Sequence, residues 1–142
     1  MRTASWVLLA VVGTLILLGG LASTYTAYSG VEDNLLPGGP TAQDLEAMNP
    51  GLANAMRGRR ATAAAFALAY AVLFLFVVFV PYRRGEVWSW WAVLVASLTL
   101  AAVIVARVPL LDTRLGAGTG LVQLGVVVLA LLLDLRRLRP PA

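Results

Sequence analysis

Long blocks of apolar residues alternate with short polar segments along this chain. Four blocks contain no charged side chain, and they cover residues 6–25, 61–80, 88–106 and 119–133. The last block becomes a span over roughly 117–135 when it takes in part of the glycine-rich GAGTG at 116–120. A helix rises about 1.5 Å per residue, so about 20 apolar residues cross a hydrocarbon core about 30 Å thick. The pattern therefore predicts four transmembrane segments.

These segments are expected to be α-helices. Inside lipid the backbone must satisfy its own hydrogen bonds, which leaves helices and closed barrels as spanning structures. A barrel strand alternates apolar and polar residues, whereas the run VLFLFVVFV at 72–80 does not alternate. We therefore predict an all-α, four-helix transmembrane bundle that forms a single integral membrane domain over residues 1–142.

The first block has a second interpretation. Arg2, the apolar run 6–18 and the small residues before Ala22 are also typical of a secretory signal peptide. Cleavage after Ala22 would leave three helices. The sequence keeps this alternative open.

The longest connection, residues 29–60, is predicted to form a loop on the outer face. Thr41 and Asp44 have the spacing of a capping box, which predicts a short helix over Ala42–Met48. Asn49 is expected to cap the next helical segment, with Pro50 at its first position. That segment should lead directly into the second span.

Small residues recur at four-residue spacing on the predicted spans, which favours close packing of helices in lipid. The third span offers Ala92 with Ala96 and Ser97 with Ala101, and the fourth begins with Gly116 and Gly120. The second offers two alanine sets, at positions 61, 65, 69 and 63, 67, 71. We favour packing within the bundle over self-association, although the same faces suit another copy or a membrane-protein partner.

Composition supports the membrane assignment and narrows the chemistry. The chain is 60% hydrophobic and 13% charged, and it contains no cysteine and no histidine. Thiol redox chemistry, catalytic triads with histidine and histidine-ligated metals are therefore excluded. We expect no catalytic residue, cofactor or metal site and no binding to nucleic acid.

The arginines predict orientation and anchoring. Six lie on the side of the two termini and five on the other side, so the positive-inside rule favours cytoplasmic termini in a bacterial inner (plasma) membrane. Tryptophan side chains prefer the head-group level. The residues expected to anchor the chain against membrane lipids are Arg83, Arg84, Trp88, Trp90, Trp91, Arg136, Arg137 and Arg139.

Polar side chains within or at the ends of the spans are the candidates for lining a ligand site. They are Gln123, Tyr70, Thr14 and Arg107. Hydroxyl and amide groups at such positions usually bond a neighbouring backbone. Arg107 is also expected to extend to the interface, where Asp112 is a possible ion-pair partner.

The turn YRRGEVWSW at residues 82–90 resembles a recurring cytoplasmic hairpin of small four-helix bacterial membrane proteins of the DoxX-like and DUF4345-like kind. The resemblance implies a four-helix membrane fold and no established reaction, and the long outer loop departs from the most compact members. Physically, we expect Pro81 to end the second helix and Gly85 to reverse the chain, with Glu86 favoured by the dipole of the third helix.

The sequence thus predicts a non-catalytic accessory or structural subunit of a membrane assembly. The alternative is a small-molecule or lipid-binding carrier that uses the bundle interior. A catalytic or cation-binding role would require the outer-loop acids Glu32, Asp33, Asp44 and Glu46 to converge.

Overall fold

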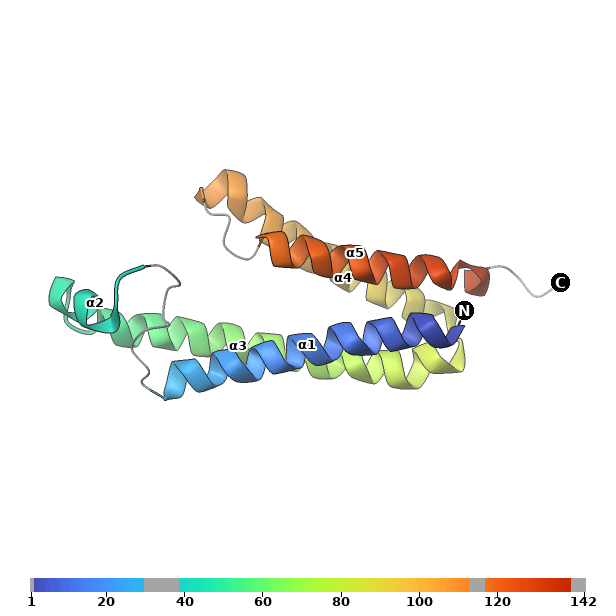
Figure 1. The fold of residues 1–142 in the computed structure, drawn as a ribbon, viewed down its shortest axis with the longest axis horizontal. Coiled ribbons are helices and arrows are strands. Elements are labelled where there is room, and N and C mark those ends of the chain that lie inside the picture. The colour runs from blue at the N-terminus through green and yellow to red at the C-terminus, as the bar shows by residue number, and fades with distance from the viewer. Residues whose placement is uncertain (1, 30–38, 113–116, 139–142) are drawn as a thin grey trace. The chain divides into compact units, whose positions relative to one another are not determined.

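Every regular element in the described part of the chain is helical, which confirms the all-α prediction. The computed structural model describes residues 2–29, 39–112 and 117–138 (Figure 1). In chain order the elements are α1 (Arg2–Tyr28), α2 (Ala42–Met48), α3 (Leu52–Val77), the π-helical turn η2 (Val78–Tyr82), α4 (Val87–Leu111), α5 (Ala117–Leu133) and the 3₁₀ turn η3 (Leu135–Leu138).

Three helical segments are long and apolar enough to cross a membrane, as expected for a multi-pass membrane protein. They are Thr3–Tyr28, Leu52–Tyr82 and Val87–Leu110, with 26, 31 and 24 residues. Helix α5 is also apolar but has only 17 residues. At about 1.5 Å per residue it covers somewhat less than a hydrocarbon core about 30 Å thick. Four spans therefore stay a prediction.

The connection between α1 and α3 contains the predicted short helix. Thr41 is the N-cap of α2, and its hydroxyl accepts from the backbone N–H of Asp44, while the Asp44 carboxylate accepts from the backbone N–H of Thr41. The capping box and the bounds Ala42–Met48 are both confirmed.

The predicted role of Asn49 is wrong. Asn49 ends α2 as its C-cap, and α3 begins only at Leu52. Gly51 lies between them with φ +87°, a left-handed conformation that reverses the chain. The carboxylate of Glu46, on α2, accepts from the Gly51 N–H at 2.9 Å and stabilises this turn. Pro50 therefore lies in the turn and not in the first position of α3.

Pro81 does not end the second apolar helix as predicted. It lies inside η2, and helical conformation continues through Arg84. In an α-helix the proline ring would crowd the carbonyl four residues earlier, and the wider π-turn relieves that contact. Gly85, with φ +90°, makes the predicted reversal before α4.

The chain forms two compact units. The first contains residues 1–14 and 73–142, and the second contains residues 15–72. In the first unit α4 and α5 pack along each other. Gly120 allows this close approach, because a Cβ atom there would lie 3.1 Å from two side-chain carbons of Ile104.

The structure tests the small-residue faces in part. On α4, Ser97 and Ala101 are both buried, as predicted, whereas Ala92 and Ala96 are half-buried. On α3, Ala71 is buried, and the other five members of the two predicted sets are exposed or half-buried. Ala53 and Ala64, the other buried alanines of α3, belong to neither set. Gly116 lies outside the described residues.

Candidate functional site

The four predicted ligand-lining residues are spread over both units. Thr14, Arg107 and Gln123 belong to the first unit and Tyr70 to the second. Thr14 is exposed, and its hydroxyl donates to the Ala10 carbonyl of its own helix at 2.9 Å. Gln123 and Tyr70 are half-buried. A shared ligand site therefore stays a prediction.

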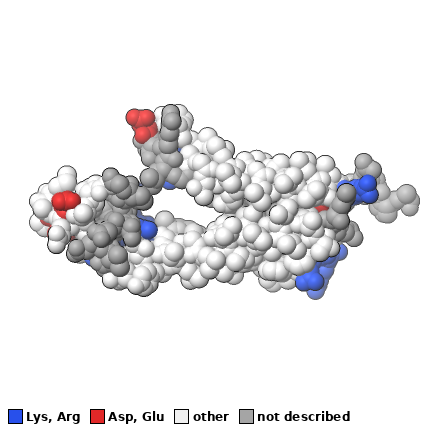
Figure 2. Space-filling view, in the orientation of Figure 1, with Lys and Arg blue, Asp and Glu red and all other residues white. Residues whose placement is uncertain are grey.

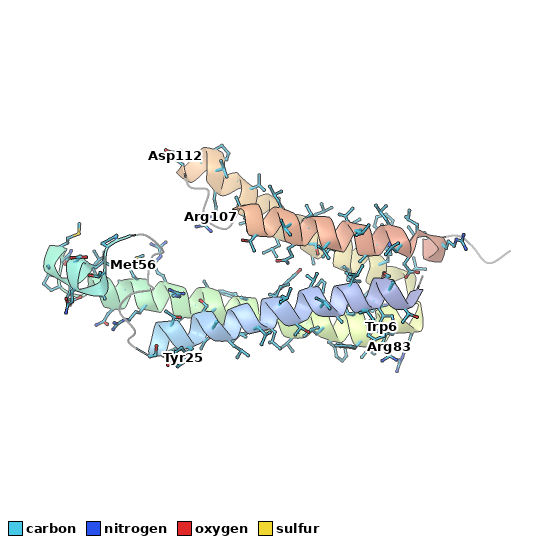
Figure 3. The ribbon with its side chains drawn as sticks, in the orientation of Figure 1. Trp6, Tyr25, Met56, Arg83, Arg107 and Asp112 are labelled. Carbon is cyan, nitrogen blue, oxygen red and sulfur yellow. The ribbon has the colours of Figure 1, made fainter. Side chains whose placement is uncertain are left out.

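Arg107 lies inside α4, which runs five residues beyond the predicted end of the third span. Its side chain is exposed, as is Asp112, which ends the helix in a left-handed conformation with φ +48°. Figure 3 shows the two residues at separate places near this end of α4. The predicted ion pair is not formed between these described residues.

The first unit contains a buried polar cluster that the sequence did not reveal. The Ser5 hydroxyl lies 2.6 Å from the Tyr82 hydroxyl and donates to the Ala130 carbonyl at 2.8 Å. Ser5 is on α1, Tyr82 on η2 and Ala130 on α5. This cluster joins three elements of the unit by hydrogen bonds inside the packed helices.

Tryptophans predicted as interfacial anchors have different environments. Trp88 and Trp91 are about half exposed, which suits head-group contact. Trp90 is only 7% exposed, and its indole N–H donates to the Leu131 carbonyl of α5 at 3.1 Å. Trp90 therefore joins α4 to α5, a role that the WSWW pattern could not distinguish from anchoring.

Arginines gather where η2 turns into α4. The Arg83 guanidinium lies 4.8 Å from the centre of the Trp6 ring, and Trp6 also contacts Phe79. Arg83 and Arg84 are exposed at this turn, and Arg136 is exposed in η3. Figure 2 shows positive side chains in separate groups on a mostly uncharged surface. The Arg137 side chain and Arg139 are outside what the structure describes.

Asp134 is a buried acidic residue in the first unit. It follows α5 directly and is only 3% exposed. Nothing in a linear pattern indicates that the turn after α5 folds this side chain inward.

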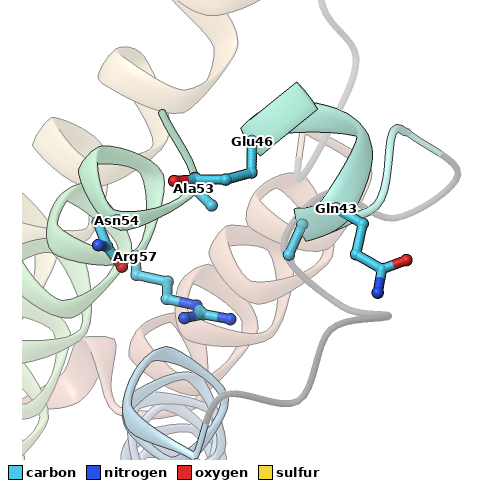
Figure 4. A pocket seen from close by; sticks show the side chains of 6 residues that line it. Gln43, Glu46, Ala53, Asn54 and Arg57 are labelled. Atoms are coloured by element: carbon cyan, nitrogen blue, oxygen red, sulfur yellow. The ribbon is translucent and has the colours of Figure 1, made fainter. Parts of the chain in front are cut away.

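The second unit contains a pocket between α2 and the start of α3. Ala42 and Ala53 line it, and with Leu45 they form a small apolar cluster against which Leu52 and Met56 pack. The cavity has a volume of about 290 Å³. Figure 4 shows side chains reaching it from both helices. The polar residues that line it are Gln43, Glu46, Asn54 and Arg57.

The outer-loop acids that are described have separate local roles. Asp44 accepts from the Thr41 hydroxyl at 2.7 Å and from the Thr41 backbone N–H, and these hydrogen bonds lower the pKa of Asp44 from 3.8. Glu46 holds the Gly51 turn. Glu32 and Asp33 lie outside the described residues. No group of three or more acidic side chains that could hold a metal ion occurs among the residues described.

Comparison with known proteins adds no relative from which a role could be transferred. No protein-family model, curated protein or solved structure matches this chain.

Proposed function

We propose that this chain is a non-catalytic integral membrane protein that serves as an accessory or structural subunit of a membrane assembly. The observation that carries the proposal is the way hydroxyl groups in the apolar helices are used. Thr14, Thr24, Thr26 and Thr99 each donate to the carbonyl four residues earlier in their own helix. The Ser5 hydroxyl connects α1 to η2 and α5 by hydrogen bonds. These hydroxyl groups are satisfied by the backbone of their own helix or by packing between elements, as a structural subunit requires.

Large apolar side chains support the same proposal. Phe66, Leu73, Phe76 and Leu121 are more than half exposed, so they suit lipid or the apolar face of another membrane protein. We also propose that the chain crosses a bacterial inner membrane four times, with α5 as the fourth span and both termini in the cytoplasm. The resemblance of residues 82–90 to the hairpin of DoxX-like four-helix membrane proteins supports the proposal of four spans.

The second candidate function is a small-molecule or lipid-binding carrier that uses the bundle interior, and Ser97 is the residue that favours it. Ser97 is 3% exposed, and its hydroxyl has no hydrogen-bond partner within the described chain. Buried polar groups without a partner are uncommon and call for an explanation such as a water or a ligand. A carrier that uses Ser97 should lose ligand binding in Ser97→Ala, whereas a structural subunit should keep its assembly.

The structural role can be tested by placing a photoreactive phenylalanine analogue at Phe66, Phe76 or Leu98 in cells. A subunit should give a discrete protein adduct from at least one position, either with a partner or with a second copy. Val127, which is fully buried, is the matched control and should give none. Lipid adducts alone at every position would contradict the proposal.

The topology is tested separately by reporter fusions. A C-terminal fluorescent protein that folds only in the cytoplasm should be bright, and a C-terminal phosphatase that works only outside should be inactive. The reverse result would show that the orientation is wrong, or that α5 does not cross the membrane.

A further inference from the structure

The pocket between α2 and α3 holds two opposite charges that do not pair with each other. Glu46 projects from α2 and Arg57 from α3, and both line the same cavity (Figure 4). One oxygen of Glu46 accepts from the Gly51 N–H, which leaves its other oxygen available. The pocket therefore offers a positive and a negative group to a molecule that enters it.

Arg57 is the feature that points to a ligand. Its Nε atom is buried and has no hydrogen-bond partner, and the chain supplies no other bond or ion pair to this side chain among the residues described. A guanidinium group has five N–H donors and binds phosphate or carboxylate by paired hydrogen bonds. Because Arg57 lines the cavity, the remaining donors of its guanidinium group can bind an anionic group there.

The position of the pocket along α3 indicates the source of that anionic group. The charge-free apolar run begins at Ala61, about one helical turn after Arg57. The other pocket wall is α2, which is packed on α3 through Leu45 and Ala53. In a membrane-spanning α3 the pocket thus lies at the level of lipid head groups.

We propose that this pocket binds the head group of a zwitterionic phospholipid that carries a primary ammonium group. Arg57 donates to the phosphate, and the available oxygen of Glu46 accepts from the ammonium. The amides of Asn54 and Gln43 line the same space and supply further hydrogen bonds. The proposal requires that α3 spans the membrane, and it is independent of the accessory role.

Soluble phosphoethanolamine has the same two charged groups, but the adjoining apolar run of α3 favours the lipid, whose acyl chains can lie along it. The test uses the full chain in detergent, stripped of lipid and examined by native mass spectrometry. Lipids with identical acyl chains and with ethanolamine, choline or glycerol head groups are added in turn. We expect the ethanolamine lipid to be retained about tenfold more than the glycerol lipid, as one charge-assisted hydrogen bond allows.

Three variants separate the contributions. Arg57→Gln should reduce retention of the ethanolamine lipid about tenfold. Glu46→Gln keeps an acceptor for the Gly51 N–H but removes the charge, so it should abolish the preference for ethanolamine over glycerol while the protein stays folded. Arg59→Gln removes an exposed charge two residues away that does not line this pocket, and it is the matched control.

Specific results would overturn the proposal. Equal losses in Arg57→Gln and Arg59→Gln would show general electrostatic attraction, and an unchanged head-group preference in Glu46→Gln would show that no ammonium is recognised. Displacement of the lipid by an equal concentration of soluble phosphoethanolamine would show that the acyl chains contribute nothing. A circular dichroism spectrum identical to that of the parent protein confirms that each variant is folded.

Discussion

Ser5 and Tyr82 share a hydrogen bond of 2.6 Å between their hydroxyl groups, across 77 residues of sequence. Both side chains are fully buried. The hydroxyl group of Ser5 has one hydrogen, and it donates this hydrogen to the Ala130 carbonyl. The Tyr82 hydroxyl is therefore the donor in the hydrogen bond to Ser5. One small side chain thus connects the beginning of α1 to η2 and to α5.

Ser5→Ala should destabilise the folded protein by about 1–2 kcal/mol, because it leaves the Ala130 carbonyl without its donor and Tyr82 without this acceptor. Unfolding in mixed detergent micelles measures the change. In a double-mutant cycle, Tyr82→Phe should cost less in the Ser5→Ala background than in the parent. Fully additive losses would show that the two hydroxyls do not interact. Thr14→Val, which changes an exposed hydroxyl bonded to its own helix, is the control.

Trp90→Phe should lower stability by about 1 kcal/mol, because the Leu131 carbonyl loses its indole donor and the buried site loses volume. Trp91→Phe is matched in chemistry but changes a ring that is 51% exposed, so its effect should stay within about 0.5 kcal/mol. The same unfolding assay compares the two variants. Equal effects would contradict the distinct role of Trp90.

Substitution by alanine should change the stability differently at two adjacent glycines of α1, Gly19 and Gly20. A Cβ at Gly20 would lie 2.8 Å from Leu68 Cδ2, whereas a Cβ at Gly19 would meet nothing within 4 Å. Gly19→Ala should raise stability by up to about 1 kcal/mol through helix propensity. Gly20→Ala should show no such gain, since Leu68 must move. Thermal unfolding of both variants decides the matter, and a gain at Gly20 equal to that at Gly19 would show that α1 and α3 are not in close contact there.

Acid should loosen the start of α2. The hydrogen bonds from Thr41 lower the pKa of Asp44 from 3.8, so the charged form is favoured in the folded helix. The resulting stabilisation is present above the ordinary pKa and is lost as the pH falls through the lowered value. An NMR titration of the Asp44 carboxyl carbon, with the amides of α2 followed in parallel, should show this. Thr41→Ala should move the pKa back toward 3.8, and no movement would mean that another group causes the shift.

The features that the sequence predicted correctly depend on neighbours in the chain. The capping box at Thr41 and Asp44 needs only a separation of three residues, and the reversal at Gly85 needs only a residue that tolerates positive φ. The apolar blocks likewise predict long helices, because each helix makes its hydrogen bonds within itself. Local predictions failed where two local solutions compete, as at Asn49, which can cap either the end of one helix or the start of the next.

By itself, the sequence determined the all-helical membrane class, the approximate positions of the long apolar helices and the exclusion of cysteine and histidine chemistry. Only the tertiary structure showed that Ser5 meets Tyr82, that Trp90 packs inward while Trp91 does not, and that Asp134 is buried. It also placed Glu46 and Arg57 around one pocket. The physical reason is that hydropathy and spacing specify a helix and its length, whereas the partner of a polar side chain depends on which faces of distant helices pack together.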